Sequence, residues 1–588
     1  MKKITLRILS HKRILAVRPG DNLADQIAAA GIPLSAYCLK RGLCGKCFVE
    51  VARGELPPVT EKETLLIRQK RLPDRYRLAC LFKVRGDLAI RIPQSSLLQE
   101  TSVLTTGLWM SVPIDPAVKK YSLEVKAPKI SAPSSWIDLL EGALKKKGLR
   151  FPLGLLKRLP SLHKEGRGHM TAVLWNDADV LALEPGDTTP RNYGIAVDIG
   201  TTTVVVELVD LGTGKTVDLA TALNGQAEFG SDVVSRISSA FLNEAGSEQL
   251  RQRIVTQLNE MLNGLADQNH ISRQHIYEIV VAGNTAMNHF LLGLPVQSLA
   301  VSPFNAVFSR LPGLRASEAG FEIGENARLF IVPNIKSFIG GDISAGLLAS
   351  GIAGRPGNYL FIDLGTNGEI VLKKGKKFLA TSTAAGPAFE GMNISSGMLA
   401  LPGAIYKAEL KKKINVFTIQ KKPPAGICGT GLIDLVALFK KSGVITAQGK
   451  ITGEQKTIPV AGDILLTQKD VREVQLAVAA IKAGVRMMLY ECHLSPQELD
   501  GIFIAGAFGN YLNVRNAMSI GLLPEIVPGK VIFIGNSSLA GAKQLLLSAP
   551  GRRTLERLIK TVAHVSLASD PSFQKIFIES LEFPKEGF

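Results

Sequence analysis

Alternating apolar and polar positions near the N-terminus predict a small domain rich in strands. Residues Ile4–Leu9 and Arg13–Val17 alternate with a period of two, which is typical of strands with one buried face. Between Asp21 and Gly31 the apolar residues recur at helical spacing, with a candidate N-cap before them and a glycine stop after them. A loop rich in cysteine follows this helix. We therefore expect an N-terminal domain over residues 1–96.

The next part of the chain is less regular. Residues 97–125 contain no long periodic element, so we expect a linker there. Within residues 126–190, two apolar runs at 171–175 and 180–184 are joined by a polar turn, which predicts a hairpin. We expect a small middle domain over this range, and nothing in it suggests catalysis.

From residue 191 to residue 588 strands, helices and glycine turns alternate, which is typical of an α/β domain. Two segments there repeat one design: Tyr-Gly-Ile-Ala-Val-Asp-Ile-Gly-Thr-Thr from residue 193 and Tyr-Leu-Phe-Ile-Asp-Leu-Gly-Thr-Asn-Gly-Glu from residue 359. Each is a buried strand with an aspartate near its end and a tight Gly-Thr turn. Such a turn offers N–H groups and hydroxyls to an anion, and the aspartate can hold Mg²⁺ through water. The repeat predicts a duplicated nucleotide-binding fold that encloses a phosphate from both sides.

Candidate residues for this site come from the two turns and from other loops that place glycine beside polar residues. We expect Asp198 and Asp363 to act at the phosphate and its metal ion. Glu228, Asp232 and Glu390 are candidate bases or water-positioning residues, with solvated loop carboxylates as the alternative for each. The expected nucleotide-binding residues are Gly200, Thr201, Thr202, Asn284, Thr285, Gly365, Thr366, Asn367 and Gly386.

These motifs resemble those of the actin, sugar kinase and heat-shock chaperone superfamily. The turns after Asp198 and Asp363 match its two phosphate motifs. A strand that runs into a glycine turn matches its adenosine motif, which implies that Gly506, Ala507 and Gly509 lie against the base and ribose. The chain has neither a Walker loop nor a Gly-x-Gly-x-x-Gly dinucleotide turn after a strand. The resemblance implies ATP as the nucleotide.

Composition adds a second chemistry to this picture. Four of the six cysteines fall within residues 38–80, which favours a metal site over a dispersed disulfide framework. Their spacing is Cys38-x5-Cys44-x2-Cys47, with Cys80 following after 32 residues. Three thiolates on one loop and a distant fourth suit a 2Fe–2S cluster, and the strand-rich surroundings resemble the β-grasp ferredoxin fold. A zinc site is the alternative, since Cys-x2-Cys also occurs in zinc knuckles.

Charge and hydropathy indicate which partners and which cellular compartment to expect. The net charge is +18, but no nucleic-acid-binding motif accompanies it, so we expect no nucleic-acid partner. The basic N-terminal domain would steer the chain toward an acidic protein, with a solvated basic surface as the alternative. No apolar run approaches the roughly 20 residues of a membrane span, and the first residues lack a signal core. We therefore expect a cytoplasmic protein without a membrane partner.

The combination of these parts resembles the reductive activators of corrinoid proteins, which serve the corrinoid iron–sulfur protein and related methyltransferase systems. The resemblance covers essentially the whole chain. It implies an ATPase that transfers a low-potential electron from its 2Fe–2S cluster to the Co(II) corrinoid of a partner protein, restoring Co(I) for methyl transfer. It also implies a low-potential electron donor and a homodimer. Because the N-terminal domain is basic, we expect it to dock on an acidic surface of the corrinoid-binding protein.

Other functions remain compatible with the same motifs. The chain could be a redox-sensing, ATP-binding regulatory module. It could activate another low-potential enzyme, such as a 2-hydroxyacyl-CoA dehydratase, although such activators carry a cysteine pair inside the ATPase fold that this chain lacks. A sugar kinase would leave the iron–sulfur domain without a role.

Overall fold

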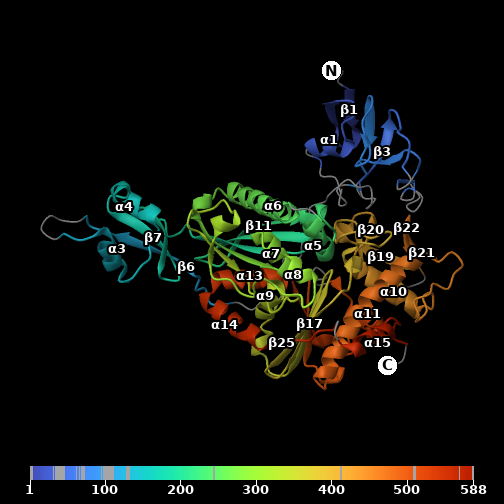
Figure 1. Ribbon diagram of the computed structural model, residues 1–588. Helices are drawn as coiled ribbons and strands as arrows, with labels where there is room; N and C mark the ends of the chain where they lie inside the picture. Colours follow the sequence, from blue (N-terminus) through green and yellow to red (C-terminus); the bar gives the residue numbers. More distant parts are fainter. Residues whose placement is uncertain are drawn as a thin grey trace. The chain divides into compact units, whose positions relative to one another are not determined.

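The computed structural model in Figure 1 divides into two compact units. One unit consists of Met1–Ser102, Gly225–Ser239 and Pro387–Gln475, and the other of Val103–Asn224, Ala240–Gly386 and Leu476–Phe588. The residues that the structure describes are 4–30, 32, 47–60, 63–64, 67, 73–93, 96, 112–127, 133–242, 245–410, 413–506, 511–567 and 570–585.

The N-terminal part of the first unit is a five-stranded sheet in the order β2-β1-β5-β3-β4. Its elements are β1 (Ile4–Ile8), β2 (Arg13–Val17), α1 (Leu23–Ala29), β3 (Phe48–Arg53), β4 (Tyr76–Leu78) and β5 (Leu88–Arg91). Strand β1 is antiparallel to β2 and parallel to β5. The alternating apolar residues of β1, including Leu6 and Ile8, are fully buried with Leu23 and Ile27 of α1. This arrangement confirms the expected strand-rich sheet with a helix, α1, between its second and third strands.

The rest of the first unit consists of two smaller sheets with helices. A three-stranded sheet has the order β19-β18-β20, and β21 and β22 form a hairpin. The elements are η3 (Gly225–Glu228), α5 (Val233–Leu242), η7 (Pro387–Glu390), β18 (Ala404–Leu410), β19 (Ile414–Thr418), β20 (Gly426–Ile427), α10 (Gly429–Lys441), β21 (Thr457–Ala461) and β22 (Ile464–Thr467). Two helices continue into the second unit: α5, and α11 (Gln468–Glu491).

Two six-stranded sheets dominate the described residues of the second unit, in the orders β11-β10-β9-β12-β14-β13 and β24-β23-β15-β16-β17-β25. The first contains β9 (Tyr193–Ile199), β10 (Thr203–Asp210), β11 (Thr216–Leu223), β12 (Ile276–Gly283), β13 (Leu314–Arg315) and β14 (Arg328–Ile331). The second contains β15 (Asn358–Leu364), β16 (Gly368–Lys374), β17 (Lys377–Thr383), β23 (Gly501–Ala505), β24 (Val531–Gly535) and β25 (Val562–His564).

The two sheets repeat one design. In the first, β9 and β10 form an antiparallel hairpin, and β12 lies parallel to β9. In the second, β15 and β16 form the hairpin, and β23 lies parallel to β15. The turns of both hairpins are the Gly-Thr motifs. The structure therefore confirms the duplicated fold expected from the repeated sequence.

Helix α9 (Gly341–Ser350) joins the cores of these two sheets, and α13 (Ser537–Leu547) packs against α9 on the first sheet. Ala345 of α9 is buried in the core of the first sheet, whereas Ile343 and Leu347 are buried in the core of the second. Small residues let the two helices approach closely, since a Cβ on Gly541 would lie 2.2 Å from the carbonyl oxygen of Ala345. The remaining α-helices of the described residues in this unit include α12 (Val514–Ser519) and five that are labelled in Figure 1: α6 (Gly246–Gln268), α7 (Thr285–Leu292), α8 (Gln297–Ala300), α14 (Ala549–Lys560) and α15 (Pro571–Ser580).

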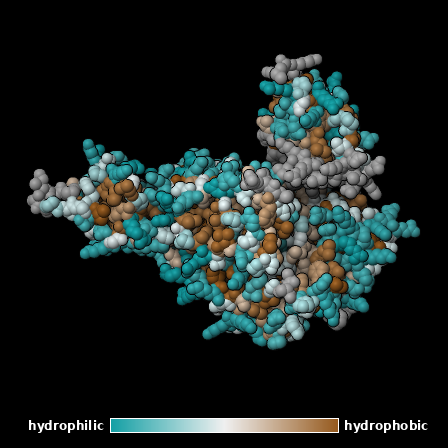
Figure 2. Space-filling view, viewed as in Figure 1, coloured by the Kyte–Doolittle hydropathy of each residue, from teal (hydrophilic) through white to brown (hydrophobic). Residues whose placement is uncertain are grey.

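A third sheet of the second unit contains the predicted hairpin, as β7 (His169–Trp175) and β8 (Asp179–Pro185). Its other strand, β6 (Val118–Glu124), lies inside the range expected to be a linker and pairs antiparallel with β7. Helices α3 (Trp136–Leu144) and α4 (Leu153–Glu165) cover it with leucine side chains. On the face shown in Figure 2 most surface residues are hydrophilic. Among the described residues, no helix combines the length and apolar character of a membrane span.

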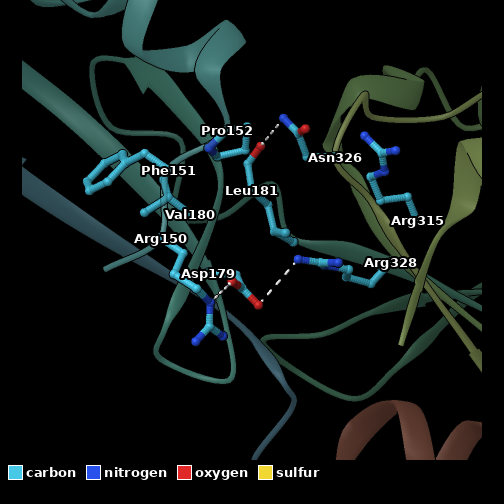
Figure 3. Close-up of a pocket in the computed structure, with 9 residues that line it drawn as sticks. All are labelled: Arg150, Phe151, Pro152, Asp179, Val180, Leu181, Arg315, Asn326 and Arg328. Atoms are coloured by element: carbon cyan, nitrogen blue, oxygen red, sulfur yellow. Dashed lines mark hydrogen bonds and ion pairs between the residues drawn. The ribbon is translucent and has the colours of Figure 1, made fainter. Parts of the chain in front are cut away.

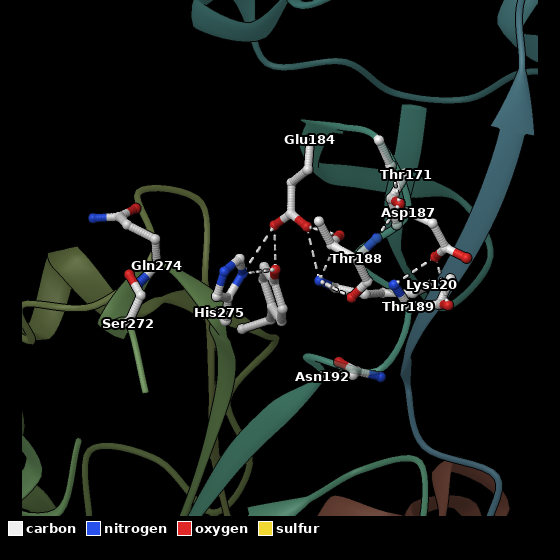
Figure 4. Close-up of polar contacts among 12 residues, drawn as sticks. Lys120, Thr171, Glu184, Asp187, Thr188, Thr189, Asn192, Ser272, Gln274 and His275 are labelled. Carbon is white, nitrogen blue, oxygen red and sulfur yellow. Dashed lines mark hydrogen bonds and ion pairs between the residues drawn. The ribbon is translucent and has the colours of Figure 1, made fainter. Parts of the chain in front are cut away.

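Buried polar contacts attach this third sheet to the first large sheet. Glu184 of β8 accepts a hydrogen bond from Tyr277 of β12 and lies 2.8 Å from the Nζ of Lys120 in β6 (Figure 4). The Nδ1 of His275 is 3.4 Å from the same carboxylate. Burial lowers the pKa of His275, although the charge of Glu184 raises it. These contacts hold the third sheet against the start of β12 in the first large sheet.

Candidate functional site

Four acidic residues gather where the two large sheets end. Asp198 lies near the end of β9, Asp363 near the end of β15, and Asp342 in the first turn of α9. Glu369 of β16 lies directly opposite Asp363 in the hairpin register and is only 8% exposed. The duplicated hairpins and the helix between them thus bring carboxylates from distant parts of the sequence together.

The electrostatics of these groups show that they share one site. Burial raises the pKa of Asp363 to about 7, and the charges of Asp342 and Asp198 raise it as well. Burial likewise raises the pKa of Asp342 to about 7, with a further contribution from Asp198. The pKa of Glu369 is raised by burial and then by Asp342 and Asp363. Such mutually repelling carboxylates favour binding of a cation.

Asp198 is held by the N-terminal end of α13. Asn536 donates from Nδ2 to one of its carboxylate oxygens at 2.8 Å, and Ser538 donates to the other at 2.7 Å. Asn536 is also the N-cap of this helix, since its Oδ1 accepts from the N–H of Leu539. Burial raises the pKa of Asp198, whereas these two hydrogen bonds lower it. The carboxylate is therefore fixed in position by its own hydrogen bonds.

The sequence reasoning missed four of these residues as site candidates: Asp342, Glu369, Asn536 and Ser538. A signal existed for Asn536, because an Asn-Ser-Ser run directly after a buried strand is a typical helix start. Glu369 follows the second Gly-Thr turn, and an in-register hairpin places it opposite Asp363. The proximity of Asp342 depends on helix packing, which the sequence pattern does not reveal.

The first Gly-Thr turn, predicted to bind phosphate, is hydrogen-bonded to helix α7. Asn284 is the N-cap of α7, accepts from the N–H of Met287 at 3.0 Å, and donates to the Thr201 hydroxyl at 3.1 Å. The N–H of Gly200 bonds the carbonyl of Thr203, and a Cβ on this glycine would lie 2.8 Å from that carbonyl oxygen. A glycine is therefore required where the chain reverses direction.

Thr202 and Thr285, the neighbouring candidates, take part in hydrogen bonds around this turn. The carbonyl of Thr202 accepts from the N–H of Asn224. Asn224 also donates from its side chain to the carbonyl of Gly200 at 2.8 Å. The hydroxyl of Thr285 donates to the carbonyl of Lys336.

The second Gly-Thr turn, also predicted to bind phosphate, has a comparable backbone arrangement. The N–H of Gly365 bonds the carbonyl of Asn367, and the N–H of Gly386 bonds the carbonyl of Thr366. Gly506 has a φ of +99°, and a Cβ there would lie 3.0 Å from an oxygen of Asp363. Gly506 thus lies beside the acidic cluster, while Ala507 and Gly509 fall outside the described residues.

No group of three or more acidic, histidine or cysteine side chains in the described part of the chain has the geometry of a direct metal site. What the structure does show is a concentration of buried negative charge at Asp198, Asp342, Asp363 and Glu369.

Glu228, Asp232 and Glu390, the three candidate bases, belong to the other compact unit. Asp232 accepts from the N–H of Ser235 at 2.8 Å at the start of α5. The fully buried Arg236 experiences the charges of Asp232 and Glu390, while burial lowers its pKa to about 10. Asp232 and Glu390 thus compensate a buried cation, and the proposed role of all three acids as bases stays a prediction.

Cys47 and Cys80 are buried in the core of the N-terminal domain, where β3 begins and just after β4 ends. The N–H of Ala79 bonds the carbonyl of Cys47 at 2.9 Å, so the two cysteine segments lie side by side. Asn22 donates to the carbonyl of Cys80 at 2.8 Å. Cys38 and Cys44 lie outside the described residues. Two buried thiols brought together by adjacent strands fit one half of a four-thiolate cluster site.

A separate cavity of about 210 Å³ opens where β8 meets the edge of the first large sheet (Figure 3). Asp179 bridges two of its arginines, at 2.5 Å from the Nε of Arg150 and 3.3 Å from a terminal nitrogen of Arg328. The guanidinium of Arg328 also lies over the ring of Trp175. None of the sequence-predicted residues lines this cavity, and its ion pairs join the third sheet to β14.

Family comparisons match nearly the whole chain. Residues 6–85 match a 2Fe-2S iron-sulfur cluster binding domain, and residues 109–190 match the RACo linker region. Residues 193–355 match the RACo middle region, and residues 357–588 match the C-terminal ASKHA domain of RACo. These matches support an iron–sulfur cluster in the N-terminal domain and a nucleotide in the C-terminal part.

Individual relatives agree with these matches. The corrinoid activation enzyme RamQ of Eubacterium limosum is 31% identical, over 95% of this chain and 96% of its own length. The Co(II) methylated amine-specific corrinoid protein reductase of Methanosarcina barkeri is 28% identical, over 67% of this chain and 78% of its own. The solved structure of a reductive activator for corrinoid iron–sulfur protein matches with a TM-score of 0.76 and 33% identity, covering 99% of both chains. The chain therefore belongs to the RACo family of reductive activators of corrinoid proteins.

Proposed function

We propose that this protein is an ATP-dependent reductive activator that transfers a low-potential electron from its own 2Fe–2S cluster to the Co(II) corrinoid of a partner protein. The observation that carries the proposal is the presence of two sites on one chain. One is a pair of buried cysteines in a ferredoxin-like sheet, and the other is a carboxylate cluster between duplicated phosphate turns. The names of the relatives support a corrinoid protein as the electron acceptor. A redox sensor or a dehydratase activator is not favoured.

On the electron-transfer side, Cys47 and Cys80 would hold the cluster together with Cys38 and Cys44. When bound, a 2Fe–2S cluster held by four thiolates supplies single electrons to an acceptor. The surrounding core includes Phe48, Leu78 and Phe82, each at most 4% exposed. These apolar side chains would shield the thiolates from water and stiffen the site.

On the nucleotide side, the chain would bind ATP by its two turns. The hydroxyls of Thr201 and Thr366 would donate to phosphate oxygens, and Gly200 and Gly365 would let the backbone approach the phosphates closely. Asp198 and Asp363 would hold Mg²⁺ through its water shell. Asp342 and Glu369 would add negative charge behind it.

The coupling of the two sites has an energetic reason. We expect the Co(II)/Co(I) couple of the partner to lie below the cluster potential, so the transfer is uphill. Each 59 mV of unfavourable potential reduces a one-electron equilibrium tenfold. Binding and hydrolysis of ATP would offset this by driving a conformational change in the complex, which raises the effective potential of the cobalt acceptor.

The decisive experiment mixes the dithionite-reduced protein with a Co(II) corrinoid protein, with and without Mg-ATP, and follows Co(I) by its absorption. We expect Co(I) to accumulate only with ATP, and ATP hydrolysis to be stimulated by the Co(II) partner. Asp363→Asn should abolish the accumulation of Co(I) that ATP drives, while the absorption spectrum of the cluster stays unchanged. Reduction at the same rate without ATP would contradict the proposal.

Three finer features belong to the same proposal. The net charge of +18 supports docking onto an acidic surface of the corrinoid-binding protein. A low-potential donor must reload the cluster after each transfer, because one electron leaves in each cycle. The family resemblance suggests a homodimer, which sedimentation of the purified protein would test.

A further inference from the structure

A buried carboxylate lies close to the cysteine segments. Glu63 is 3% exposed, and its Oε1 accepts a hydrogen bond of 2.6 Å from the backbone N–H of Leu78. Leu78 is two residues before Cys80, and it is the register partner of Phe48, which directly follows Cys47. The acid is therefore attached to the strand pair that carries both described cysteines.

The position of Glu63 is well defined by its contacts. Its own N–H bonds the hydroxyl of Thr60, and the hydroxyl of Thr64 bonds the carbonyl of the same Thr60. These bonds connect Glu63 and Thr64 to Thr60, while the carboxylate of Glu63 reaches the backbone of β4. A buried acid needs a reason, because moving an isolated carboxylate out of water is costly.

We propose that Glu63 is a potential-setting residue, whose negative charge lowers the reduction potential of the 2Fe–2S cluster. This inference rests on the proposed function, in that it needs a cluster bound at Cys80. Reduction adds one electron, taken from an external low-potential donor, to a centre whose four thiolates already make it negative. A nearby carboxylate screened little by water disfavours that added charge. A lower potential would make the reduced protein a stronger donor to Co(II).

Arg77 in β4 is a buried cation, and its charge would affect the reduction potential in the opposite direction. Arg77 is 7% exposed, and its guanidinium donates to the carbonyls of Pro57, Asp74 and Tyr76. Within the described residues no ion pair joins it to Glu63, so the two charges do not cancel through direct contact. Its charge would raise the potential, and the effect of Glu63 has to be measured with Arg77 in place.

The test is an EPR-monitored redox titration of the full-length protein and three variants. Glu63→Gln removes the charge but keeps an oxygen that can accept from the Leu78 N–H. Glu63→Asp keeps the charge but shortens the side chain. Glu50→Gln is the matched control, because it removes one negative charge from β3 of the N-terminal sheet. The side chain of Glu50 is 31% exposed, and its Oε1 lies 3.4 Å from a terminal nitrogen of Arg91.

We expect Glu63→Gln to shift the one-electron equilibrium toward the reduced cluster about tenfold, which is about 59 mV. Glu63→Asp and Glu50→Gln should stay close to the wild-type potential, since the charge is kept in one and is already water-screened in the other. The EPR spectrum of the reduced cluster should keep its shape in all variants, showing intact ligation.

Two results would overturn the inference. One is an unchanged potential in Glu63→Gln. The other is an equal shift in Glu63→Asp, which would mean that hydrogen-bond geometry rather than charge sets the potential. Failure of the proposed function would look different. A purified wild-type protein without a 2Fe–2S signal would disprove the cluster itself, and a cluster that reduces Co(II) without ATP would leave the role of Glu63 intact.

Discussion

Asp363 and Glu369 lie directly opposite each other across the β15–β16 hairpin, so that the second phosphate turn carries a pair of facing carboxyl groups. An ordinary hairpin would not place like charges there, since opposed like charges destabilise a strand pair. Asp342 and Asp198 increase the repulsion felt by Asp363. The acidic cluster thus contains electrostatic repulsion that a bound cation would relieve.

This repulsion predicts a pH dependence of stability in the absence of nucleotide. The pKa of Asp363 and of Asp342 is raised from 3.8 to about 7 in the folded protein. Between about pH 4 and 7 the folded state therefore holds more protons than the unfolded state. The free energy of unfolding then falls as pH rises through this window. Thermal melts of the nucleotide-free protein from pH 5 to 8 should show a declining Tm, and Mg-ATP should reduce the decline.

Asp363→Asn should flatten this profile and raise the Tm at pH 8, because it removes one of the repelling charges. The exposed Asp267→Asn provides a control, and it should keep the wild-type slope. A wild-type Tm that does not fall between pH 5 and 7 would refute the prediction, as would a slope in Asp363→Asn equal to that of the control.

Asn284 allows helix capping to be separated from phosphate binding. Asn284→Ala loses the N-cap of α7, which we expect to lower the free energy of unfolding by about 1 kcal/mol. Asn284→Asp keeps an oxygen for the N–H of Met287 but loses the donor to Thr201, and it adds negative charge beside the phosphate turn. We therefore expect near-wild-type stability but a KM for ATP raised about tenfold or more. Chemical denaturation would measure the stability of each variant, and steady-state ATPase assays would measure its KM for ATP. A KM of Asn284→Asp equal to that of the wild type would speak against a phosphate role for this loop.

Substitution of a cluster cysteine should separate cluster binding from ATP hydrolysis. Cys80→Ala should lose the cluster, measured as bound iron and visible absorption, because one of four thiolates is removed. Basal ATP hydrolysis should change less than about twofold, since Cys80 lies in a different compact unit from the acidic cluster. Cys428→Ala is the control, because burial raises the pKa of that thiol and it donates to the carbonyl of Ile405. Loss of iron in this control to the same extent would contradict the assignment of Cys80.

The sequence predicted most of this architecture because its signals are local. Strand alternation located β1 and β2, and the repeated Asp-x-Gly-Thr turns predicted both hairpins of the duplicated fold. The contribution of Asp342 was not predictable in the same way. This residue approaches Asp363 only because α9 packs between two sheets, and no short-range pattern encodes that contact. Strand β6 was also missed, since its buried positions are few and its pairing with β7 is distant in sequence.

The close approach of α9 and α13 makes a final prediction about how packing supports the acidic cluster. A Cβ on Gly541 would lie 2.2 Å from the carbonyl oxygen of Ala345, which is far inside van der Waals contact and is backbone on the opposing side. Gly541→Ala must therefore push α13 away from α9, and we expect it to lower the free energy of unfolding by about 1–3 kcal/mol. Because Asn536 and Ser538 at the start of α13 hold Asp198, the same displacement should weaken ATP binding.

Gly264→Ala in α6 is the matched control for that substitution, since no atom lies within 4 Å of its Cβ position. Alanine there should stabilise the protein by about 0.5–1 kcal/mol, because it restricts the unfolded chain and suits a helix interior. Denaturant melts and nucleotide titrations of both variants would measure the contrast. If Gly541→Ala were as stable as Gly264→Ala and bound ATP with wild-type affinity, close contact between α9 and α13 could not be what positions Asp198 and Asp342. We expect Gly541→Ala to lower the free energy of unfolding and Gly264→Ala to raise it. Together with weaker ATP binding by Gly541→Ala, this would show that the contact between α9 and α13 holds the two aspartates in one site.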